Sequence, residues 1–398
     1  MKSGYLSQYF SGIIAKTLSE VEASRERSNQ HEFNGTVAMK SLFGTVRKRY
    51  TTRFIYLDDE NDPITADGFL TWYDAREHHP TRSEYRLFFN STAVSQAASA
   101  NDVLFIGLRP DDSVLVVIAA ANSTISSQLA WLFGIQAGAQ FTVVTNLDNN
   151  RNQLEYASTF ILEQIGITVD DDCSDYLDEM LTRFGGNFPQ TREFSSFARS
   201  TLAGLDSRDD PDAVLLSWLD REERLFRALE KHLIQQQLAK GFDDVDDFIR
   251  YSLSVQNRRK SRVGLALENH FEVVLKEHKI QYDRTKVTEN RSKPDFIFPG
   301  IKEYHDPMFP VENLTMLGSK STCKDRWRQV LAEADRIDHK HLLTLESAIS
   351  VHQTDEMQAK KLQLVVPKEI HKTYTTSQQS WLWDVRSLLE MLLEKQER

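Results

Sequence analysis

The sequence has little cysteine, glycine and proline, and it lacks long apolar runs. Two cysteines in 398 residues, Cys173 and Cys323, exclude a disulfide framework and a cysteine-based zinc site. No segment approaches the roughly 20 apolar residues that span a bilayer. The first eight residues contain no apolar core of signal-peptide length. We therefore expect a globular protein of the cytoplasm without membrane contact.

The sequence also has no overall excess of basic residues, since its formal net charge is -10. This balance argues at first against a polyanionic partner. However, acidic residues cluster at 209–212 and 243–247, whereas basic residues gather at 257–262 and 320–328. A protein of this kind can carry a locally basic cleft, and its low net charge would limit nonspecific adhesion to DNA.

The chain is long enough for two or three domains. Its first part, from about residue 33 to 145, is typical of a β-rich barrel or sandwich, because short apolar runs alternate with turn signals. From about residue 150 the pattern becomes helical, and 207–212 has the composition of an interdomain linker. The strands expected in the first part are 52–57, 68–73, 85–89, 103–107 and 114–118.

The last part of the chain predicts an α/β sheet domain. Helices are expected from about 214 to 278. Short strand-like runs follow at 296–298, 311–317, 342–345 and 362–366, with helices between them. After Lys320, apolar residues at helical spacing predict one more helix, with Trp327 in the core and with Arg326 and Glu333 on one flank. The apolar residues of this stripe are Trp327, Val330, Leu331, Ala334 and Ile337.

Three charged residues in this part could form a phosphodiester-cleaving site. Asp295 lies in the run Lys-Pro-Asp-Phe-Ile-Phe, Lys320 follows 25 residues later, and Glu333 follows after another 13. Mg²⁺ needs only one or two protein carboxylates, which Asp295 and Glu333 could supply. Lys320 would orient water and offset the charge of the transition state. Glu268 could add a metal or water contact; the alternative is a turn aspartate with a surface lysine and glutamate.

Two basic segments could contact DNA. In Lys324-Asp325-Arg326, the cations suit guanine O6 and N7 and the carboxylate suits cytosine N4, so the triplet could read G·C pairs. The alternative is a solvated first helical turn with an internal ion pair. The second segment predicts a helix end that faces phosphates, and it contains Arg258, Arg259, Lys260 and Arg262.

At these residues the chain resembles the EcoRII-type restriction endonucleases. The resemblance runs from about Leu219 to Pro367. The matching segments are 240–242, 254–262, 293–299, 304–306, 309–314, 322–329 and 333–335. Before residue 205 the likeness is weaker, but Trp72-Tyr-Asp-Ala-Arg76 and Thr81-Arg-Ser-Glu-Tyr-Arg86 look like that family's effector-DNA segment.

This resemblance implies a multidomain α+β protein whose C-terminal α/β domain is restriction-endonuclease-like, with a PD-(D/E)xK active site. The family branch takes its last acid from the helix after the lysine strand, and Gly318 stands where the unpermuted motif has an acid. The resemblance assigns catalytic positions to Asp295, Lys320, Glu333, Glu268 and Tyr304. It assigns reading of CC/GG pairs to Lys324, Asp325 and Arg326, and a flipped-base pocket to Asn257.

For the N-terminal part the resemblance implies a β-pseudobarrel that binds a second copy of the site through Arg76, Glu84 and Arg86. Tyr85 departs from the family's basic residue. The domains expected are an effector domain at 1–170, a linker region at 171–212 and an endonuclease domain at 213–398.

The expectation is therefore a homodimeric, Mg²⁺-dependent type II endonuclease of the bacterial cytoplasm. It would cut double-stranded DNA at a CC…GG sequence such as CCWGG and be activated by an effector copy of the site. Two alternatives remain. One is a modification-dependent DNA endonuclease, and the other is a DNA-binding regulator with an inactive nuclease domain.

Overall fold

The computed structural model describes residues 6–23, 31–147, 156–167, 176–323 and 326–397. The chain divides into two compact units. The first unit comprises Met1–Thr168 and Ser347–Thr354, and the second comprises Val169–Glu346 and Asp355–Arg398. Each unit is described by itself.

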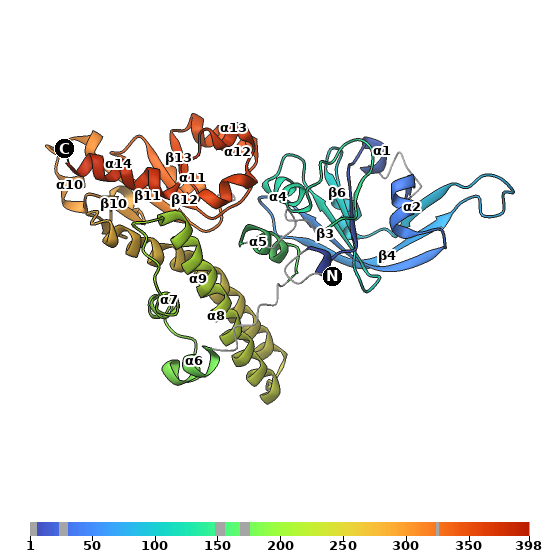
Figure 1. Cartoon of the computed structure of the whole chain (residues 1–398), viewed down its shortest axis with the longest axis horizontal. Helices are drawn as coiled ribbons and strands as arrows, with labels where there is room; N and C mark the ends of the chain where they lie inside the picture. The colour runs from blue at the N-terminus through green and yellow to red at the C-terminus, as the bar shows by residue number, and fades with distance from the viewer. Residues whose placement is uncertain (1–5, 24–30, 148–155, 168–175, 324–325, 398) are drawn as a thin grey trace. The chain divides into compact units, whose positions relative to one another are not determined.

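The first unit contains a curled eight-stranded sheet (Figure 1). The strand order is β2-β5-β4-β3-β7-β6-β1-β8, and all neighbours are antiparallel except the parallel pair β3 and β7. All five strands expected from the sequence are present. The strands are β1 Gly12–Thr17, β2 Glu32–Asn34, β3 Lys48–Leu57, β4 Ile64–Asp74, β5 Tyr85–Phe89, β6 Val103–Leu108, β7 Val114–Ala119 and β8 Thr142–Val144.

Alternating side chains build the core of this unit. Along β3, Tyr50 and Phe54 are buried while the residues between them, apart from Thr52, are exposed, as expected for a sheet with one covered face. Trp72 of β4 is fully buried, and its Nε1 donates to Gly44 O at 3.0 Å. The helices are η1 Leu6–Gln8, α1 Glu20–Ala23, α2 Val37–Phe43, α3 Ala93–Ala97, α4 Thr124–Phe133 and α5 Tyr156–Gln164.

The second unit contains a five-stranded sheet in the order β13-β12-β11-β10-β9. Strands β11, β12 and β13 are parallel, whereas β10 runs antiparallel to β9 and β11. Together with the surrounding helices, this sheet makes the chain as a whole a mixed α+β protein. The strands are β9 Asp283–Arg284, β10 Phe296–Phe298, β11 Thr315–Lys320, β12 Lys340–Thr344 and β13 Leu362–Val365.

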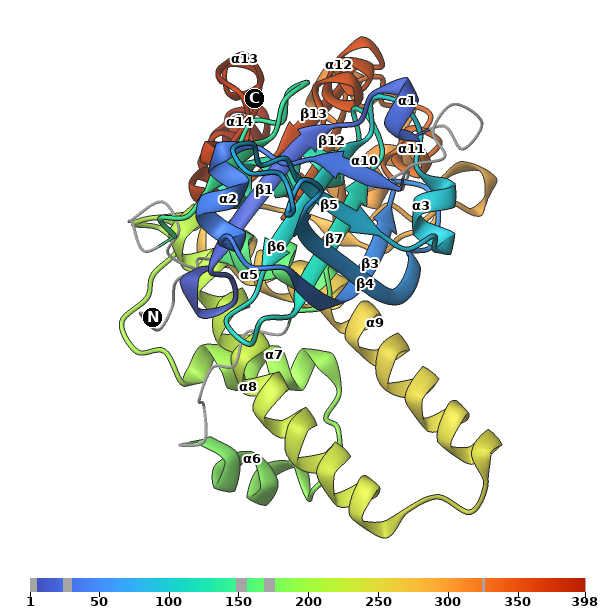
Figure 2. The ribbon, with the colours of Figure 1, turned by 90° about the vertical axis from the view of Figure 1, so that its right-hand side faces the viewer.

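Two long helices, α8 and α9, lie side by side in this unit (Figures 1 and 2). Asp210 caps α8, and the Asp212 carboxylate accepts backbone N–H groups of Lys368, Val385 and Arg386. The segment 207–212, expected as a linker, is therefore bonded into the second unit. The helices are α6 Leu177–Phe184, α7 Thr191–Ser200, α8 Pro211–Lys240, α9 Val245–Glu277 and α14 Val385–Glu397.

Short helices complete the structure around the second sheet. Among the described residues, no helix is long and apolar enough to cross a membrane. The remaining elements are η4 Glu289–Arg291, α10 Ile301–His305, η5 Val311–Asn313, α11 Trp327–Leu331, α12 Val351–Ala359, η6 Lys368–Thr373 and α13 Thr376–Gln379.

Candidate functional site

Two adjacent strands bring Asp295 and Lys320 together. Asp295 directly precedes β10, and Lys320 is the last residue of β11, its antiparallel neighbour. Lys320 Nζ lies 2.7 Å from Asp295 Oδ2. The backbone N–H of Ser319 donates to the same oxygen at 2.7 Å. One carboxylate oxygen is thus held by two donors, while the side chain keeps 15% exposure.

Gly318 explains why the strand itself carries no second acid. A Cβ atom at this position would lie 2.8 Å from Cγ2 of Val330, which belongs to α11. Real Cβ contacts essentially never come this close. The close approach of α11 to β11 therefore disfavours any side chain at position 318, because Val330 would have to shift to admit one.

Glu333 lies in the turn after α11. The apolar stripe predicted a helix through Ile337, but α11 ends at Leu331, so Arg326 and Glu333 do not share a helix flank. The core assignment of Trp327 is confirmed, because its side chain is fully buried. The early end is accompanied by a positive φ of 51° at Ala334, which reverses the backbone before β12.

The Glu333 carboxyl interacts electrostatically with Asp295 and Lys320. Burial raises its pKa to about 7, the negative charge of Asp295 raises it too, and the positive charges of Lys320 and Lys340 oppose the shift. Its Oε2 is buried and has no hydrogen-bond partner among the residues that the structure describes. A buried carboxylate oxygen without a donor is costly unless a cation or water satisfies it.

Glu268 approaches the same site from α9. Its Oε2 accepts a bond of 2.7 Å from Nη2 of Arg284 on β9. Burial raises the pKa of Glu268, the charge of Asp295 adds to this, and Arg284 and Lys320 lower it. The sequence-predicted residues Asp295, Lys320, Glu333 and Glu268 therefore influence one another electrostatically.

Tyr304 has a different place. Its side chain is buried, its hydroxyl donates to Glu289 Oε2 at 2.6 Å, and it accepts the backbone N–H of Arg336 at 3.3 Å. Burial and Glu289 raise the pKa of the phenol. Tyr304 thus contacts the turn that follows Glu333, and its structural partners lie in that turn and in η4.

The residues present fit a hard divalent cation. Among the described residues there is no group of three or more His, Cys, Asp or Glu side chains that could hold a metal ion. Mg²⁺ makes a smaller demand, since it keeps several waters and binds through one or two carboxylates plus substrate phosphates. The carboxylates of Glu333 and Asp295 supply such oxygens.

The segment expected to read bases is only partly described. Lys324 and Asp325 lie outside the described residues. Arg326 is exposed and directly precedes α11, and its backbone N–H donates to Cys323 O at 2.7 Å. Cys323 is fully buried.

The basic segment around residue 260 lies within α9 and not at a helix end. Asn257 is exposed there. Arg258 lies over the Phe188 ring at 3.8 Å, and Arg259 Nη2 pairs with Glu230 Oε2 at 2.5 Å. The arginines of this segment are thus largely occupied within the helical layer.

Arg262 illustrates this most clearly. Its side chain is buried and forms ion pairs with Glu222 at 3.4 Å and with Glu223. His270 also lies on α9 and its side chain is fully buried. Its Nε2 lies 2.9 Å from Glu222 Oε2. Sequence reasoning missed this buried ionic group and placed the Arg262 guanidinium at the surface.

In the first unit, Arg76, Glu84 and Arg86 form one ion-pair network. Arg76 Nε and Arg86 Nη2 each lie 2.6 Å from a different oxygen of Glu84. Arg86 Nη1 also pairs with Glu32 Oε2 at 3.0 Å. Arg86 and Arg76 lower the pKa of Glu84. The structure brings the three sequence-predicted residues together and adds Glu32, whose place on β2 gave no signal in the sequence.

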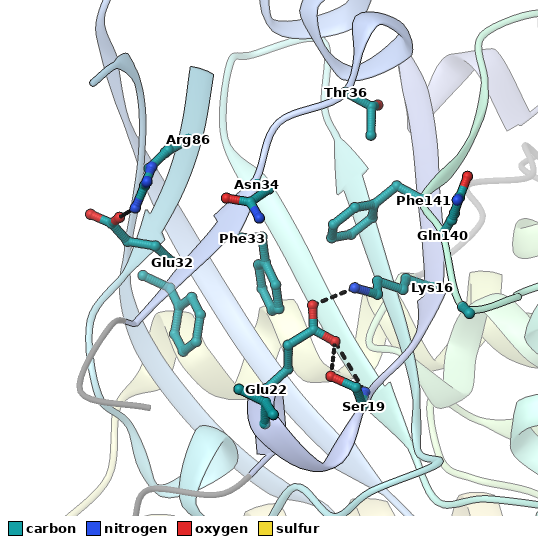
Figure 3. Close-up of a pocket in the computed structure, with 13 residues that line it drawn as sticks. Lys16, Ser19, Glu22, Glu32, Phe33, Asn34, Thr36, Arg86, Gln140 and Phe141 are labelled. Carbon is teal, nitrogen blue, oxygen red and sulfur yellow. Dashed lines mark hydrogen bonds and ion pairs between the residues drawn. The ribbon is translucent and has the colours of Figure 1, made fainter. Parts of the chain in front are cut away.

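A pocket of about 560 Å³ opens beside this network (Figure 3). Glu32 and Arg86 line one side, and Phe33 and Phe141 contribute aromatic surface. On the opposite side Lys16 pairs with Glu22. The pocket thus combines charged and aromatic groups next to residues expected to contact DNA.

Sequence reasoning missed three basic residues near the predicted site. These are Arg284 beside Glu268, and Lys340 and Arg336 beside the Glu333 turn. Lys340 had a usable signal, because a lysine at the head of an apolar strand must find buried acceptors. Arg284 and Arg336 had none, since their partners are distant in the sequence.

Comparison with known proteins finds similarity in the C-terminal part of the chain. Residues 226–389 match the model of the family EcoRII C terminal. The type II restriction enzyme EcoRII of Escherichia coli is 45% identical over 188 residues, which cover 47% of this chain and 46% of that enzyme. The chain thus spans less than half the length of this curated relative.

Solved structures give weaker matches. Metal-depleted Ecl18kI in complex with uncleaved DNA is 17% identical, covers 56% of this chain and 85% of that chain, and has a TM-score of 0.46. A PspGI–substrate DNA complex is 16% identical, covers 52% and 93%, and has a TM-score of 0.42. Similarity at this level carries no argument about function.

Proposed function

Since residues 226–389 match the model of the family EcoRII C terminal, we propose that the chain is a type II restriction endonuclease that hydrolyses both strands of DNA. The observation that carries the proposal is the cluster of Asp295, Lys320 and Glu333. It joins the Asp295 carboxylate, which accepts two hydrogen bonds, the ammonium of Lys320, and the half-buried Glu333 carboxylate, whose Oε2 has no partner within the described part of the chain. Two carboxylates and a lysine are the groups that metal-assisted phosphodiester hydrolysis needs.

In this proposal Asp295 and Glu333 hold Mg²⁺. Bound there, the ion would polarise the phosphate and lower the pKa of water. Lys320 Nζ would orient the attacking water and offset charge on the phosphorane-like transition state, an electrostatic effect that is usually large. Glu268 would contribute a further water or metal contact, and Arg284 fixes its carboxylate. Tyr304 would act indirectly, through the hydrogen bond that its hydroxyl accepts from Arg336 in the turn after Glu333.

We propose a CC…GG target such as CCWGG. Lys324, Asp325 and Arg326 would read the G·C pairs, with each good bidentate contact contributing about 1–3 kcal/mol of discrimination. Asn257, exposed on α9, would line a pocket for a flipped central base. Arg262 is assigned no base contact in this proposal, because its guanidinium is buried against two glutamates.

The first unit would bind a second, effector copy of the site through Arg76, Glu84 and Arg86, and so raise cleavage on multi-site DNA. The enzyme would act as a homodimer, because a near-palindromic site matches a twofold axis. The domains proposed are 1–170 for effector DNA and 213–398 for cleavage. The region between them, 171–212, contains helices of the second unit.

The test is digestion of unmethylated multi-site phage DNA with Mg²⁺, followed by sequencing of the fragment ends. The proposal expects discrete ends at one CC…GG motif. Asp295→Ala should lower the cleavage rate about 1000-fold or more while leaving DNA binding in Ca²⁺ intact. Asp306→Asn, at an exposed carboxylate of the same unit, is the matched control and should cut normally.

Two results would replace this proposal. Cutting of methylated copies alone would establish a modification-dependent endonuclease. Binding without cleavage in either Mg²⁺ or Mn²⁺ would indicate a DNA-binding regulator. An Asp295→Ala enzyme with full activity would refute the active-site assignment itself.

A further inference from the structure

The turn that carries Glu333 is an unusual piece of backbone for a metal ligand. It spans residues 332–338, between α11 and β12, and is not part of either element. Ala334, the residue after Glu333, has a positive φ of 51° and is buried. A non-glycine residue in this conformation persists only where its surroundings hold it. Some group must therefore fix the turn.

Lys340 meets that requirement. It is the first residue of β12 and is only 7% exposed. Its Nζ donates to Ile337 O at 2.7 Å and, more weakly, to Ala334 O at 3.4 Å. These two carbonyls bracket the end of the turn. An ammonium group, with three donors and no acceptor, suits such a site better than a neutral side chain would.

Arg336 holds the same turn from the other side. Its Nη2 donates to Phe309 O at 2.7 Å, and its Nη1 donates to Glu303 O at 3.3 Å and to Tyr304 O. All three acceptors are backbone carbonyls outside the turn. Lys340 and Arg336 thus tie the turn to β12 and to the segment 303–309, and both use buried or half-buried cations.

We propose that Lys340 is a positioning residue for Glu333: it fixes the turn through the carbonyls of residues 334 and 337 and thereby holds the Glu333 carboxylate where a divalent cation binds. The inference rests on the proposed function, because it assumes that Glu333 is a metal ligand. Outer-layer partners of metal ligands typically change metal affinity about 10- to 100-fold when removed.

The experiment compares Lys340→Met with Lys340→Arg. Methionine keeps the length and removes the donors, whereas arginine keeps a cation with donors. Mn²⁺ affinity is measured by the electron paramagnetic resonance signal of free Mn²⁺, with no cleavage involved. We expect Lys340→Met to weaken Mn²⁺ binding about 10- to 100-fold and Lys340→Arg to restore most of it. The Mg²⁺ concentration for half-maximal cleavage should shift in parallel.

Lys361 provides the matched control. Its Nζ also contacts this turn, but through the exposed Asp338 at 3.4 Å. Lys361→Gln should leave Mn²⁺ affinity unchanged, because a surface pair of this kind does not fix the backbone. An equal loss in Lys361→Gln and Lys340→Met would overturn the proposal, since it would reflect charge alone.

A double-mutant cycle with Glu333→Gln separates positioning from general stability. If Lys340 acts through Glu333, adding Lys340→Met to Glu333→Gln weakens Mn²⁺ binding no further. Independent, additive losses would refute the proposal, as would a folded Lys340→Met protein with wild-type Mn²⁺ affinity. Should Lys340→Met fail to fold, Arg336→Lys, which shortens the reach to Phe309, carries the same cycle. A wild-type protein that binds no Mn²⁺ would instead contradict the proposed function.

Discussion

The two groups of residues expected to face DNA differ in the burial and pairing of their carboxylates, and so in the direction in which the pKa is shifted. In the second unit, Glu333 is half-buried, its Oε2 has no partner in the ranges that the structure describes, and its pKa is raised to about 7. In the first unit, Glu84 is partly exposed, each of its oxygens faces an arginine, and its pKa is lowered. The arrangement around Glu333 therefore favours the binding of a cation. The Glu84 carboxylate is already paired with two arginines, so DNA that binds there must replace existing ion pairs with new ones.

This difference predicts where substitutions should change the free energy of unfolding. A buried site depends on close packing and on groups that burial disfavours, so single substitutions there should change the free energy of unfolding measurably. An exposed ion-pair network contributes little to folding, since solvent screens it. Substitutions in it should affect DNA binding and leave stability nearly unchanged.

Gly318→Ala tests the packing side and should have the largest effect on stability. Its Cβ would meet Val330 Cγ2 at 2.8 Å, and overpacking of this kind costs about 1–3 kcal/mol. Urea unfolding measures the loss. Gly264→Ala in α9 is the control, because nothing lies within 4 Å of its Cβ, and it should stabilise the protein by roughly 0.5–1 kcal/mol. Destabilisation that is equal at both positions would contradict the packing argument.

Glu333→Gln tests the electrostatic side, in the absence of metal. The folded-state pKa of about 7 lies above the ordinary value of 4.5, so the folded protein binds an extra proton between these pH values. Wild-type stability should therefore fall as pH rises from about 4.5 to 7 and stay low above 7. The glutamine variant should lack this fall and gain about 1–2 kcal/mol at pH 8, after allowance for partial exposure.

Mg²⁺ sharpens this test. A ligand that binds only the folded, ionised form should restore wild-type stability at pH 8 and leave Glu333→Gln little changed. Thermal melting with and without Mg²⁺ at pH 5 and pH 8 measures both effects. A wild-type protein whose metal-free stability rises from pH 5 to pH 8 relative to the variant would show that the Glu333 pKa is not raised.

Arg86→Ala should have the smallest effect on folding. Its ion pairs with Glu32 and Glu84 are partly exposed, so the melting temperature should change by less than about 2 °C. Binding of an effector duplex to the catalytically inactive Asp295→Ala protein should weaken about 10-fold and lose part of its salt dependence. Arg53→Ala removes a comparable surface pair with Asp67 and should bind DNA normally. A large loss of stability in Arg86→Ala would erase the contrast between the two regions.

The sequence predicted the presence of helices and strands better than it predicted where they end. Five strands of the first unit follow from apolar runs between turn residues, because local pattern and burial agree there. The helix predicted through Ile337 ends instead at Leu331, since Ala334 and Ile337 are buried by the turn that follows and not by a continued helix. An apolar stripe records burial and does not distinguish these two backbones.

The site shows the same limit. Asp295 and Lys320 were predicted from their motif and residue types, and in the structure the pairing of β10 with β11 brings them together. Arg262 was misplaced because its charge suggested solvent, whereas Glu222 and Glu223, about 40 residues earlier, bury it. Partners distant in the chain, such as Glu32 for Arg86 and Arg284 for Glu268, leave no local trace.

The contact between Gly318 and Val330 also limits which mutational routes are open to this chain. An aspartate at position 318 would need its whole side chain in space that Val330 occupies. A single substitution that placed an acid on β11 at this position would therefore destabilise the fold. Val330 would have to become smaller beforehand, and that change alone would leave a cavity against the strand. Packing between one strand and one short helix thus makes an acid at position 318 accessible only through two coordinated substitutions.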